Sequence, residues 1–264
     1  VMTSPDGINW TQRTCPTMDW HSVCWSPELG LFVAVSYGGT NPVMTSPDGI
    51  NWTQRTCPTL NWHSVCWSPE LGLFVAVSYG GTNPVMTSPD GINWTQRTCP
   101  TMNWYSVCWS AELGLFVAVA HGGTNQVMTS PDGINWTQRT VPTMNWCSVC
   151  WSPELGLFVA VSYGGTNPVM TSPNGINWTQ RTCPTMDWHS VCWSAELGLF
   201  VAVSYAGTNQ VMTSPDGINW TQRTCPTMNW YSVCWSAELG LFVAVAHGGT
   251  NQVMTSPDGI NWTQ

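Results

Sequence analysis

The chain has 264 residues, of which 8% are charged, with 14 carboxylates against six basic residues, all of them arginine. A net charge of −8 does not provide the basic face that a nucleic-acid-binding protein requires. No apolar run approaches the roughly 18 residues needed for a helix that spans a bilayer. We therefore expect neither nucleic acid nor a membrane as a partner.

The sequence repeats every 42 residues, with copies that begin at Val1, Val43, Val85, Val127, Val169 and Val211 and a shortened copy from Val253. Strand-forming runs at 21–26, 31–37, 43–46 and 50–56 are separated by Gly, Pro, Asn and Asp. Helical periodicity is absent. Four short strands in a repeat of about 40 to 45 residues are typical of one β-propeller blade.

The first copy contains the turn Ser4-Pro5-Asp6-Gly7-Ile8-Asn9-Trp10, which returns in every later copy, with Asn174 in place of the aspartate in the fifth. We interpret Asp6 as an acceptor for backbone N–H groups of its own turn, with Trp10 packed between blades. The turn resembles the Asp-box, or BNR repeat, of sialidase-like β-propellers, although it is one residue shorter. The resemblance implies a position between the third and fourth strands of a blade and a structural role for the box. The residues at the aspartate position are Asp6, Asp48, Asp90, Asp132, Asn174, Asp216 and Asp258.

Twelve cysteines are present, and most recur at two fixed positions of the repeat. Val141 replaces the first of these in one copy, while the second, Cys150, remains. This pattern indicates small apolar packing sites occupied by reduced thiols rather than disulfide bridges. Reduced cysteines favour a cytoplasmic location.

The next hairpin carries an informative exchange. His21 and Tyr37 frame it in the first copy, whereas Tyr105 and His121 trade places in the third. With a three-residue turn at 28–30 and a left-handed Gly30, His21 would face Tyr37 directly across the ladder. The same register gives one bulky and one slim face, so that blades would stack large side into small side around a ring.

We therefore predict an all-β fold, a six-bladed β-propeller of four-stranded antiparallel blades that forms a single domain over residues 1–264. The predicted blades are 15–56, 57–98, 99–140, 141–182, 183–224 and 225–264. Residues 1–14 remain as an extra hairpin of third and fourth strands, which competes with 253–264 for the closing position, begins an incomplete seventh blade, or pairs with another molecule. Because unpaired strand edges associate readily, this hairpin is a candidate for homodimerisation.

The resemblance to sialidases raises the question of catalysis, since those enzymes gather an arginine triad, an acid and a tyrosine–glutamate pair from different blades. Here the arginines, from Arg13 to Arg223, occur once per copy on predicted outer strands. Catalysis requires distinct groups with pKa values set apart by distinct surroundings, and near-identical blades do not provide them. We predict that the protein is not an enzyme and requires no cofactor.

The start of each first strand brings a polar or aromatic side chain toward one rim of the predicted channel. These residues are His21, His63, Tyr105, Cys147, His189 and Tyr231. Three histidines and a cysteine are potential metal ligands, but the paired exchange favours simple cross-strand packing, and ligand distances of about 2.0 to 2.3 Å are too short to span a channel. We predict no metal site.

One tryptophan of each repeat enters the first strand opposite a glycine, where it either covers the bare backbone or offers a platform on which a sugar stacks. The tryptophans are Trp20, Trp62, Trp104, Trp146, Trp188 and Trp230. The hydrogen-bonding residues predicted beside them are Asp19, Asp187, Tyr37, Tyr79, His121, Tyr163, Tyr205 and His247.

The third and sixth copies are identical at every position, which indicates recent amplification of one blade, or design. Residues of such copies have had little opportunity to specialise. We predict a non-catalytic, lectin-like module that binds a glycan or a protein at several equivalent sites. The alternative is a structural or protein-interaction scaffold without a small-molecule ligand.

Overall fold

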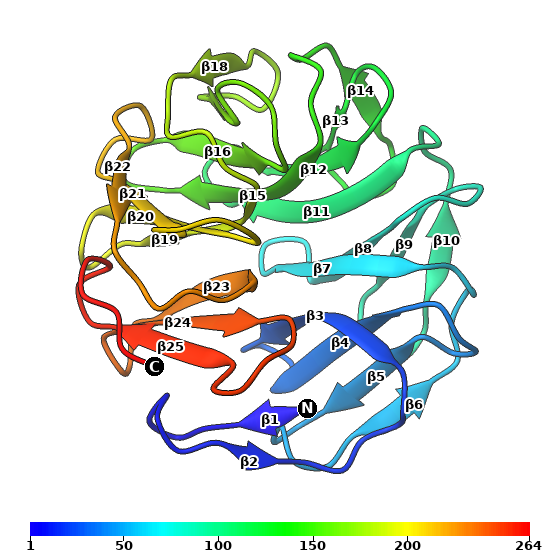
Figure 1. Ribbon diagram of the computed structural model, residues 1–264. Coiled ribbons are helices and arrows are strands. Elements are labelled where there is room, and N and C mark those ends of the chain that lie inside the picture. The colour runs from blue at the N-terminus through cyan, green and yellow to red at the C-terminus, as the bar shows by residue number, and fades with distance from the viewer. The chain divides into compact units, whose positions relative to one another are not determined.

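The computed structural model describes all 264 residues, which form 25 β-strands and no helix (Figure 1). Nothing in the chain forms a helix that could cross a bilayer. Six antiparallel sheets follow one another along the sequence, and neighbouring strands in each sheet are consecutive in the chain. The predicted fold class, an all-β six-bladed β-propeller, is confirmed, and we number the sheets as blades 1 to 6 in chain order.

The strands of the blades recur at equivalent positions of the repeat. The first strands are β3 (Asp19–Ser26), β7 (Trp62–Ser68), β11 (Asn103–Ser110), β15 (Trp146–Ser152), β19 (Trp188–Ser194) and β23 (Trp230–Ser236). The second strands are β4 (Leu31–Tyr37), β8 (Leu73–Ser78), β12 (Leu115–His121), β16 (Leu157–Ser162), β20 (Leu199–Ser204) and β24 (Leu241–Ala246). The third strands are β5 (Val43–Ser46), β9 (Val85–Ser88), β13 (Val127–Ser130), β17 (Val169–Ser172), β21 (Val211–Ser214) and β25 (Val253–Ser256). The fourth strands are β6 (Thr53–Arg55), β10 (Thr95–Arg97), β14 (Thr137–Arg139), β18 (Thr179–Arg181) and β22 (Thr221–Arg223).

The two ends of the chain differ from this pattern. In blade 6 the fourth strand is reduced to a single bridge between Thr255 and Thr263. At the other end, β1 (Met2–Thr3) and β2 (Thr11–Gln12) form a two-stranded sheet of their own. Because β25 pairs with β24, residues 253–264 belong to blade 6, and the N-terminal hairpin does not replace them.

The chain divides into two compact units, each of which contains three consecutive blades. Unit 1 comprises Val1–Ser4 and Trp10–Val141 and holds blades 1 to 3. Unit 2 comprises Pro5–Asn9 and Pro142–Gln264 and holds blades 4 to 6. The packing described below is the packing within each unit.

The register of the first hairpin differs from the prediction by one residue. Ser26 pairs with Leu31 and Cys24 with Val33, so the turn between the strands contains four residues instead of three. A bulge between Trp20 and Ser22 then leaves His21 outside the ladder. Gly30 does adopt the predicted left-handed conformation, with φ of 56°. The predicted direct pairing of His21 with Tyr37 is therefore wrong, although their rings still lie 5.6 Å apart.

Within each unit, the bulky face of one blade packs against the slim face of its neighbour. This packing was predicted, but the residues on the two faces differ from the predicted ones. Trp62, Val65, Trp67 and Phe74 of blade 2 pack in one cluster with residues of blade 1, and all four are buried. Blade 1 contributes its smaller side chains to this cluster, namely Cys24, Leu31, Val33, Val35 and Val43. Equivalent clusters join blades 2 and 3, 4 and 5, and 5 and 6. The one-residue shift in register moves Val33 and Val35 to the slim face and Phe32 to the bulky face.

The seven-residue turn that follows each third strand, which we call the box turn, packs closely on the preceding blade in blades 2, 3, 5 and 6. Gly91, in the turn of blade 2, has φ of 71°, and a Cβ there would lie 2.9 Å from both Leu31 Cδ2 and Val33 Cγ2 of blade 1. Backbone conformation and close approach therefore both require glycine at this position. In unit 2, a Cβ at Gly7 would lie 3.5 Å from Leu241 Cδ1 and 3.6 Å from Val243 Cγ2 of blade 6, which is ordinary van der Waals contact, so at this position only the φ of 74° requires glycine.

Polar contacts also join neighbouring blades at fixed positions. The indole N–H of Trp67 donates to the Glu28 carboxylate at 2.7 Å, and the Val65 N–H donates to Ser22 Oγ at 3.3 Å. The same two contacts join blade 3 to blade 2. The Trp109 indole N–H donates to Glu70, and the Val107 N–H donates to Ser64 Oγ. Within a unit, these contacts fix the position of one blade along the strand direction of the next blade.

Candidate functional site

The structure places the tryptophans of the predicted stacking platform in the core. Trp62, Trp104, Trp146, Trp188 and Trp230 are fully buried, while Trp20 is half-buried. Each indole N–H donates to a proline carbonyl four residues earlier, as in Trp62 to Pro58 O at 2.8 Å. The five fully buried rings offer no free face to a ligand, which excludes the platform role considered for them. The expected position opposite a glycine is also wrong, since Trp20 pairs with Ser36. The cause is the register, which turns the buried tryptophans inward with Val65 and Phe74.

The other predicted binding residues gather around an aromatic cluster in unit 1. The Tyr105 and His121 rings stack with centroids 3.7 Å apart and planes 10° apart, and His63 lies 3.9 Å from Tyr105. Tyr79 lies 5.7 Å from Tyr105 and 6.0 Å from Tyr37. Tyr37 is 38% exposed, and Asp19 pairs with it across the ladder. Blades 1 to 3 thus bring three tyrosines and three histidines into one chain of ring contacts.

The corresponding cluster of unit 2 is looser, because Cys147 replaces one ring. His189 lies 4.0 Å from Tyr231, whereas Tyr205 and His247 lie more than 6 Å from their ring neighbours. Burial, with smaller effects from Cys147 and Tyr205, raises the pKa of Tyr231 to about 12. Tyr163 is 41% exposed. Asp187 is half-buried, and its backbone carbonyl accepts a hydrogen bond from Tyr205 N–H at 3.0 Å.

The cysteines of the repeat form no disulfide bonds. Burial raises the pKa of Cys24, Cys57, Cys99 and Cys183 to about 12. At neutral pH these groups are neither nucleophiles nor thiolate ligands. No group of three or more histidine, cysteine or acidic side chains is arranged to hold a metal ion.

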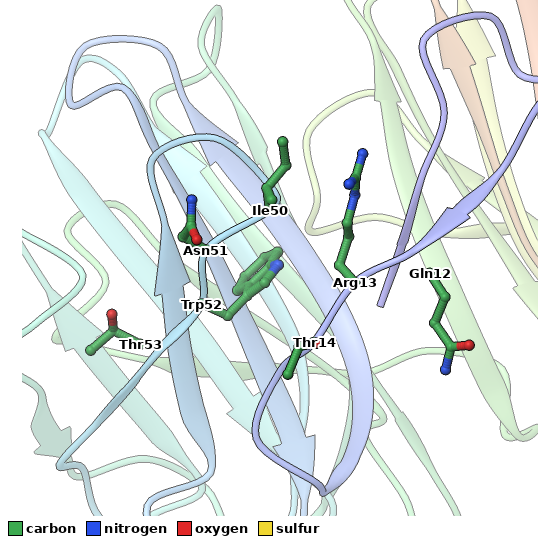
Figure 2. Close-up of a pocket in the computed structure, with 7 residues that line it drawn as sticks. All are labelled: Gln12, Arg13, Thr14, Ile50, Asn51, Trp52 and Thr53. Atoms are coloured by element: carbon green, nitrogen blue, oxygen red, sulfur yellow. The ribbon is translucent and has the colours of Figure 1, made fainter.

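A repeated surface pocket lies between the fourth strand of one repeat and the box turn of the next. In unit 1 the first such pocket has a volume of about 450 Å³. Figure 2 shows its lining, with Arg13 on one side and Trp52 and Asn51 on the other. The lining residues are Gln12, Arg13, Thr14, Ile50, Asn51, Trp52 and Thr53.

The same lining occurs twice more, with volumes of about 480 Å³ in unit 1 and about 580 Å³ in unit 2. The second pocket is lined by Gln54, Arg55, Thr56, Ile92, Asn93, Trp94 and Thr95. The third is lined by Gln222, Arg223, Thr224, Ile260, Asn261, Trp262 and Thr263. Each pocket therefore combines a guanidinium, two amides, two hydroxyls and an indole in the same order along the chain. We call these the rim pockets.

Hydrogen bonds hold the two key side chains of a rim pocket in place. Arg55 donates through Nε to Thr45 Oγ1 at 2.8 Å, so its remaining N–H groups lie at the outer end of the guanidinium. The Trp94 indole N–H donates to Gly91 O at 3.0 Å and is not available to a ligand. The indole therefore contributes a ring surface to the pocket, and the arginine contributes donors.

The box turns place the tryptophan and asparagine that line the rim pockets. Asp90 Oδ1 accepts from the Ile92 and Asn93 N–H groups at 2.8 Å, and Oδ2 accepts from the Asn93 side chain at 2.7 Å. Burial opposes the charge of Asp90, but the hydrogen bonds from Asn93 and Ile92 together outweigh it and lower its pKa to about 2. The prediction that the box aspartate binds backbone N–H groups of its own turn is confirmed. In the first copy, Asp6 accepts from Ile8 and Asn9 N–H at 2.9 and 2.7 Å.

Sequence reasoning did not identify the rim pockets. It assigned the arginines to outer strands, which is where β6, β10 and their equivalents place them. The sequence did not predict that Gln-Arg-Thr of one repeat lies against Ile-Asn-Trp-Thr of the next repeat, about 38 residues later in the chain. One feature of the sequence could have indicated the pockets. The segments Gln-Arg-Thr and Ile-Asn-Trp-Thr keep their polar residues from copy to copy, although they lie in strands and turns exposed to solvent.

Comparisons with known proteins show structures of similar fold but no protein of similar sequence. No known sequence family matches the chain, and no curated protein does so. A similar solved structure is the extracellular domain of a candidate one-component system from B. thetaiotaomicron, with a TM-score of 0.68 and 10% identity. That alignment covers 95% of this chain but only 35% of the other, so this chain spans about a third of that relative.

Two further solved structures are also similar in fold and have low sequence identity to this chain. The β-propeller domain of Cps50 (Swd1) from Myceliophteria thermophila has a TM-score of 0.63 at 10% identity, over 97% of this chain and 85% of that one. A chain of the nidogen/laminin complex has a TM-score of 0.54 at 11% identity, over 74% of both chains. At these identities the likeness shows the fold alone. The chain has the β-propeller fold, which is consistent with a non-catalytic binding or scaffold module.

Proposed function

We propose that the protein is a non-catalytic, multivalent binding module whose rim pockets each accept one carbohydrate unit. The observation that carries this proposal is that three separate pockets have the same seven residue types in the same order. A single pocket of this kind would be an accident of surface shape. A repeated pocket with a repeated lining is suited to repeated binding.

The chemistry of the lining supports a sugar as the ligand. Amides, hydroxyls and a guanidinium supply the donors and acceptors that fix the orientation of a polyhydroxylated ring. The box tryptophan supplies an apolar surface for the C–H face of the sugar, since its N–H is already bonded to a backbone carbonyl. The guanidinium also suits a carboxylate, which would extend the ligand class to acidic sugars.

Weak single sites become useful when several act together. Pockets open to solvent and lined by polar groups bind one sugar weakly, but equivalent pockets on one molecule raise the effective affinity for a surface that displays many sugars. This is the lectin-like behaviour predicted from the repeat. It requires no distinct catalytic group, and each arginine here has the same partner, a threonine of the neighbouring strand.

The test is a glycan array followed by titration calorimetry with the best ligand. We expect binding to several equivalent sites. Arg55→Met keeps the aliphatic stem and removes the charge of one pocket. It should therefore lower the number of binding sites by one and leave the affinity of the others unchanged. The triple variant Arg13→Met, Arg55→Met, Arg223→Met should lower it by three.

Glu70→Gln serves as the control, since Glu70 lies outside the rim pockets and bonds Trp109. It should leave the number of sites unchanged. An array without binding, together with arginine variants that alter only stability, would contradict the proposal and favour the alternative. That alternative is a structural or protein-interaction scaffold without a small ligand. Turnover of a sialoside would overturn the non-catalytic assignment and favour the sialidase-like resemblance.

A further inference from the structure

Blade 1 exposes a face that the other blades bury. Val23 is 59% exposed, whereas Val65 and Val107 at the same position of the repeat are each 5% exposed. Trp25 is 41% exposed, whereas Trp67 is 8% exposed. We call Trp20, Val23, Trp25 and Phe32 the open face of blade 1. On the side of the open face, blade 1 has a neighbour in unit 1 only at its outer part, where Thr3 and Gln12–Thr14 of the N-terminal hairpin lie against its box turn.

The rest of unit 1 shows what normally covers this face. In blade 2 the equivalent residues pack against the first and second strands of blade 1, which contribute Cys24, Leu31, Val33 and Val35. In blade 3 they pack against Cys66, Leu73, Val75 and Val77 of blade 2. The cover is in each case a β-hairpin with the same slim apolar face.

Two polar groups of blade 1 also lack the acceptors that their equivalents have. The Trp67 and Trp109 indole N–H groups donate to Glu28 and Glu70, but the Trp25 indole N–H has no protein acceptor. The Val65 and Val107 N–H groups donate to Ser22 and Ser64, and no serine of a preceding blade approaches Val23. The missing cover would thus supply a glutamate in its turn and a serine in its first strand.

We propose that the open face of blade 1 is a docking surface for one β-hairpin, made of the first and second strands of this same 42-residue repeat and supplied by a separate polypeptide segment. Such a hairpin contains every group that is missing. Its slim face fits Val23, Trp25 and Phe32, its turn glutamate accepts the Trp25 N–H, and its serine accepts the Val23 N–H. The surface is independent of the rim pockets, which lie on the outer strands.

A folded second copy is a poorer occupant than a free segment. Its first and second strands are already committed, since each second strand pairs with a third strand and each slim face of blades 1, 2, 4 and 5 covers the next blade of its unit. Only blade 6 keeps slim-face residues exposed, with Val245 at 36% and Cys234 also exposed. This gives a direct way to distinguish the two occupants.

The experiment uses the full chain and a fluorescently labelled synthetic peptide of residues 61–79, under reducing conditions. This peptide holds Ser64, Glu70, Val75 and Val77, which cover blade 3 in the intact chain. We expect saturable binding of one peptide per chain by fluorescence anisotropy. An isolated hairpin is at best marginally stable in water, so binding should be accompanied by a gain of β-structure in the peptide.

Matched variants on both partners test the geometry. Val23→Glu places a charge in the centre of the open face and should weaken binding at least about tenfold, because a buried unpaired charge is strongly unfavourable. Leu113→Glu is the control, since Leu113 is 42% exposed in the turn of blade 3 and lies outside the open face. A peptide with Val75→Ser and Val77→Ser should bind at least about tenfold more weakly, and a peptide with Glu70→Ala should bind measurably more weakly.

Three results would overturn the proposal. The first is no saturable binding of the peptide to a chain that circular dichroism shows to be folded. The second is binding that Val23→Glu and Leu113→Glu weaken equally. The third is a dimer in sedimentation experiments that both Val23→Glu and Val245→Glu dissociate and the peptide does not, since this would identify a second copy as the occupant.

Discussion

The inner and outer halves of a blade are ordered by different forces. The bulky side of the inner half, made of the first and second strands, is buried against the preceding blade of its unit, as the fully buried Trp104 and Phe116 of blade 3 show. The outer half, made of the third and fourth strands with the box turn, is held by bonds that the turn makes to itself, such as those around Asp90. One repeat therefore contains a half that depends on its neighbours and a half that largely specifies its own conformation.

The N-terminal hairpin provides this comparison within the molecule, because it is an outer half without an inner half. Its box bonds match those of complete blades, with Asp6 accepting from Ile8 N–H, Asn9 N–H and the Asn9 side chain. Its arginine also keeps the usual partner, since Arg13 Nε donates to Thr3 Oγ1 at 2.8 Å. Only the strands shorten, to two residues each, because no second strand pairs with β1. Local bonding therefore survives the loss of the inner half, while strand length does not.

The largest effect should come from the inner half. Trp104→Ala removes a fully buried indole and leaves the Pro100 carbonyl without its donor, so we expect a loss of about 3 to 5 kcal/mol in the free energy of unfolding. Trp20→Ala at the equivalent but only half-buried position of blade 1 should cost distinctly less. Chemical denaturation of both variants gives the comparison. Equal losses would show that neighbouring-blade packing does not determine the stability of the inner half.

An intermediate effect should come from the aspartate of an outer half. Asp90→Ala removes a carboxylate that binds two backbone N–H groups and should cost about 1 to 3 kcal/mol. Asp90→Asn should cost less, because Asn174 occupies this position in blade 4 and still accepts from Ile176 and Asn177 N–H at 3.0 and 2.9 Å. Denaturation of the two variants checks the order. A cost for asparagine as large as that for alanine would contradict the view that the backbone bonds dominate.

The box aspartates also predict how stability depends on pH. Hydrogen bonds from the turn outweigh burial and lower the pKa of Asp90, Asp132, Asp216 and Asp258 to about 2, below the usual 3.8. A carboxyl whose pKa is lower in the folded state stabilises the fold above its unfolded pKa and loses that effect as pH falls. We therefore expect stability to fall between about pH 4 and pH 2. Thermal melts of the variant with all four replaced by asparagine should show a flatter decline, and an unchanged decline would assign the acid sensitivity to other groups.

The same contrast explains how much the sequence could predict. The box turn, the role of its aspartate and the number of blades follow from short-range patterns, and the structure agrees with them. The register of the inner hairpin did not follow, because a bulge after Trp20 and a fourth turn residue together shift the ladder by one position. Alternating valines, alanines and cysteines fit either register locally. The choice is made by the neighbouring blade, whose bulky face selects Val33 and Val35.

For this reason the site was also predicted only in part. The exposure of Tyr37 and the closeness of His21 to Tyr37 agree with expectation. Of the two roles considered for the tryptophans, the sugar platform is excluded for the five that are fully buried. The rim pockets remained hidden because each is shared by two repeats. A residue pattern within one copy does not reveal which strand of the next copy it will meet.

The smallest effect should come from a polar tie between inner halves. The Trp109 N–H donates to Glu70 at 2.7 Å in a setting open to solvent, so Glu70→Ala should cost only about 0.5 to 1.5 kcal/mol. Glu70→Gln keeps an acceptor oxygen and should cost less still. Glu238 of blade 6 is the internal control, because it accepts no tryptophan N–H and bonds only its own turn at Ser236. Glu238→Ala should therefore be close to neutral in the same denaturation experiment. A Glu70→Ala effect no larger than the Glu238→Ala effect would mean that apolar nesting alone sets the alignment of neighbouring blades, and that the tie to tryptophan contributes nothing measurable.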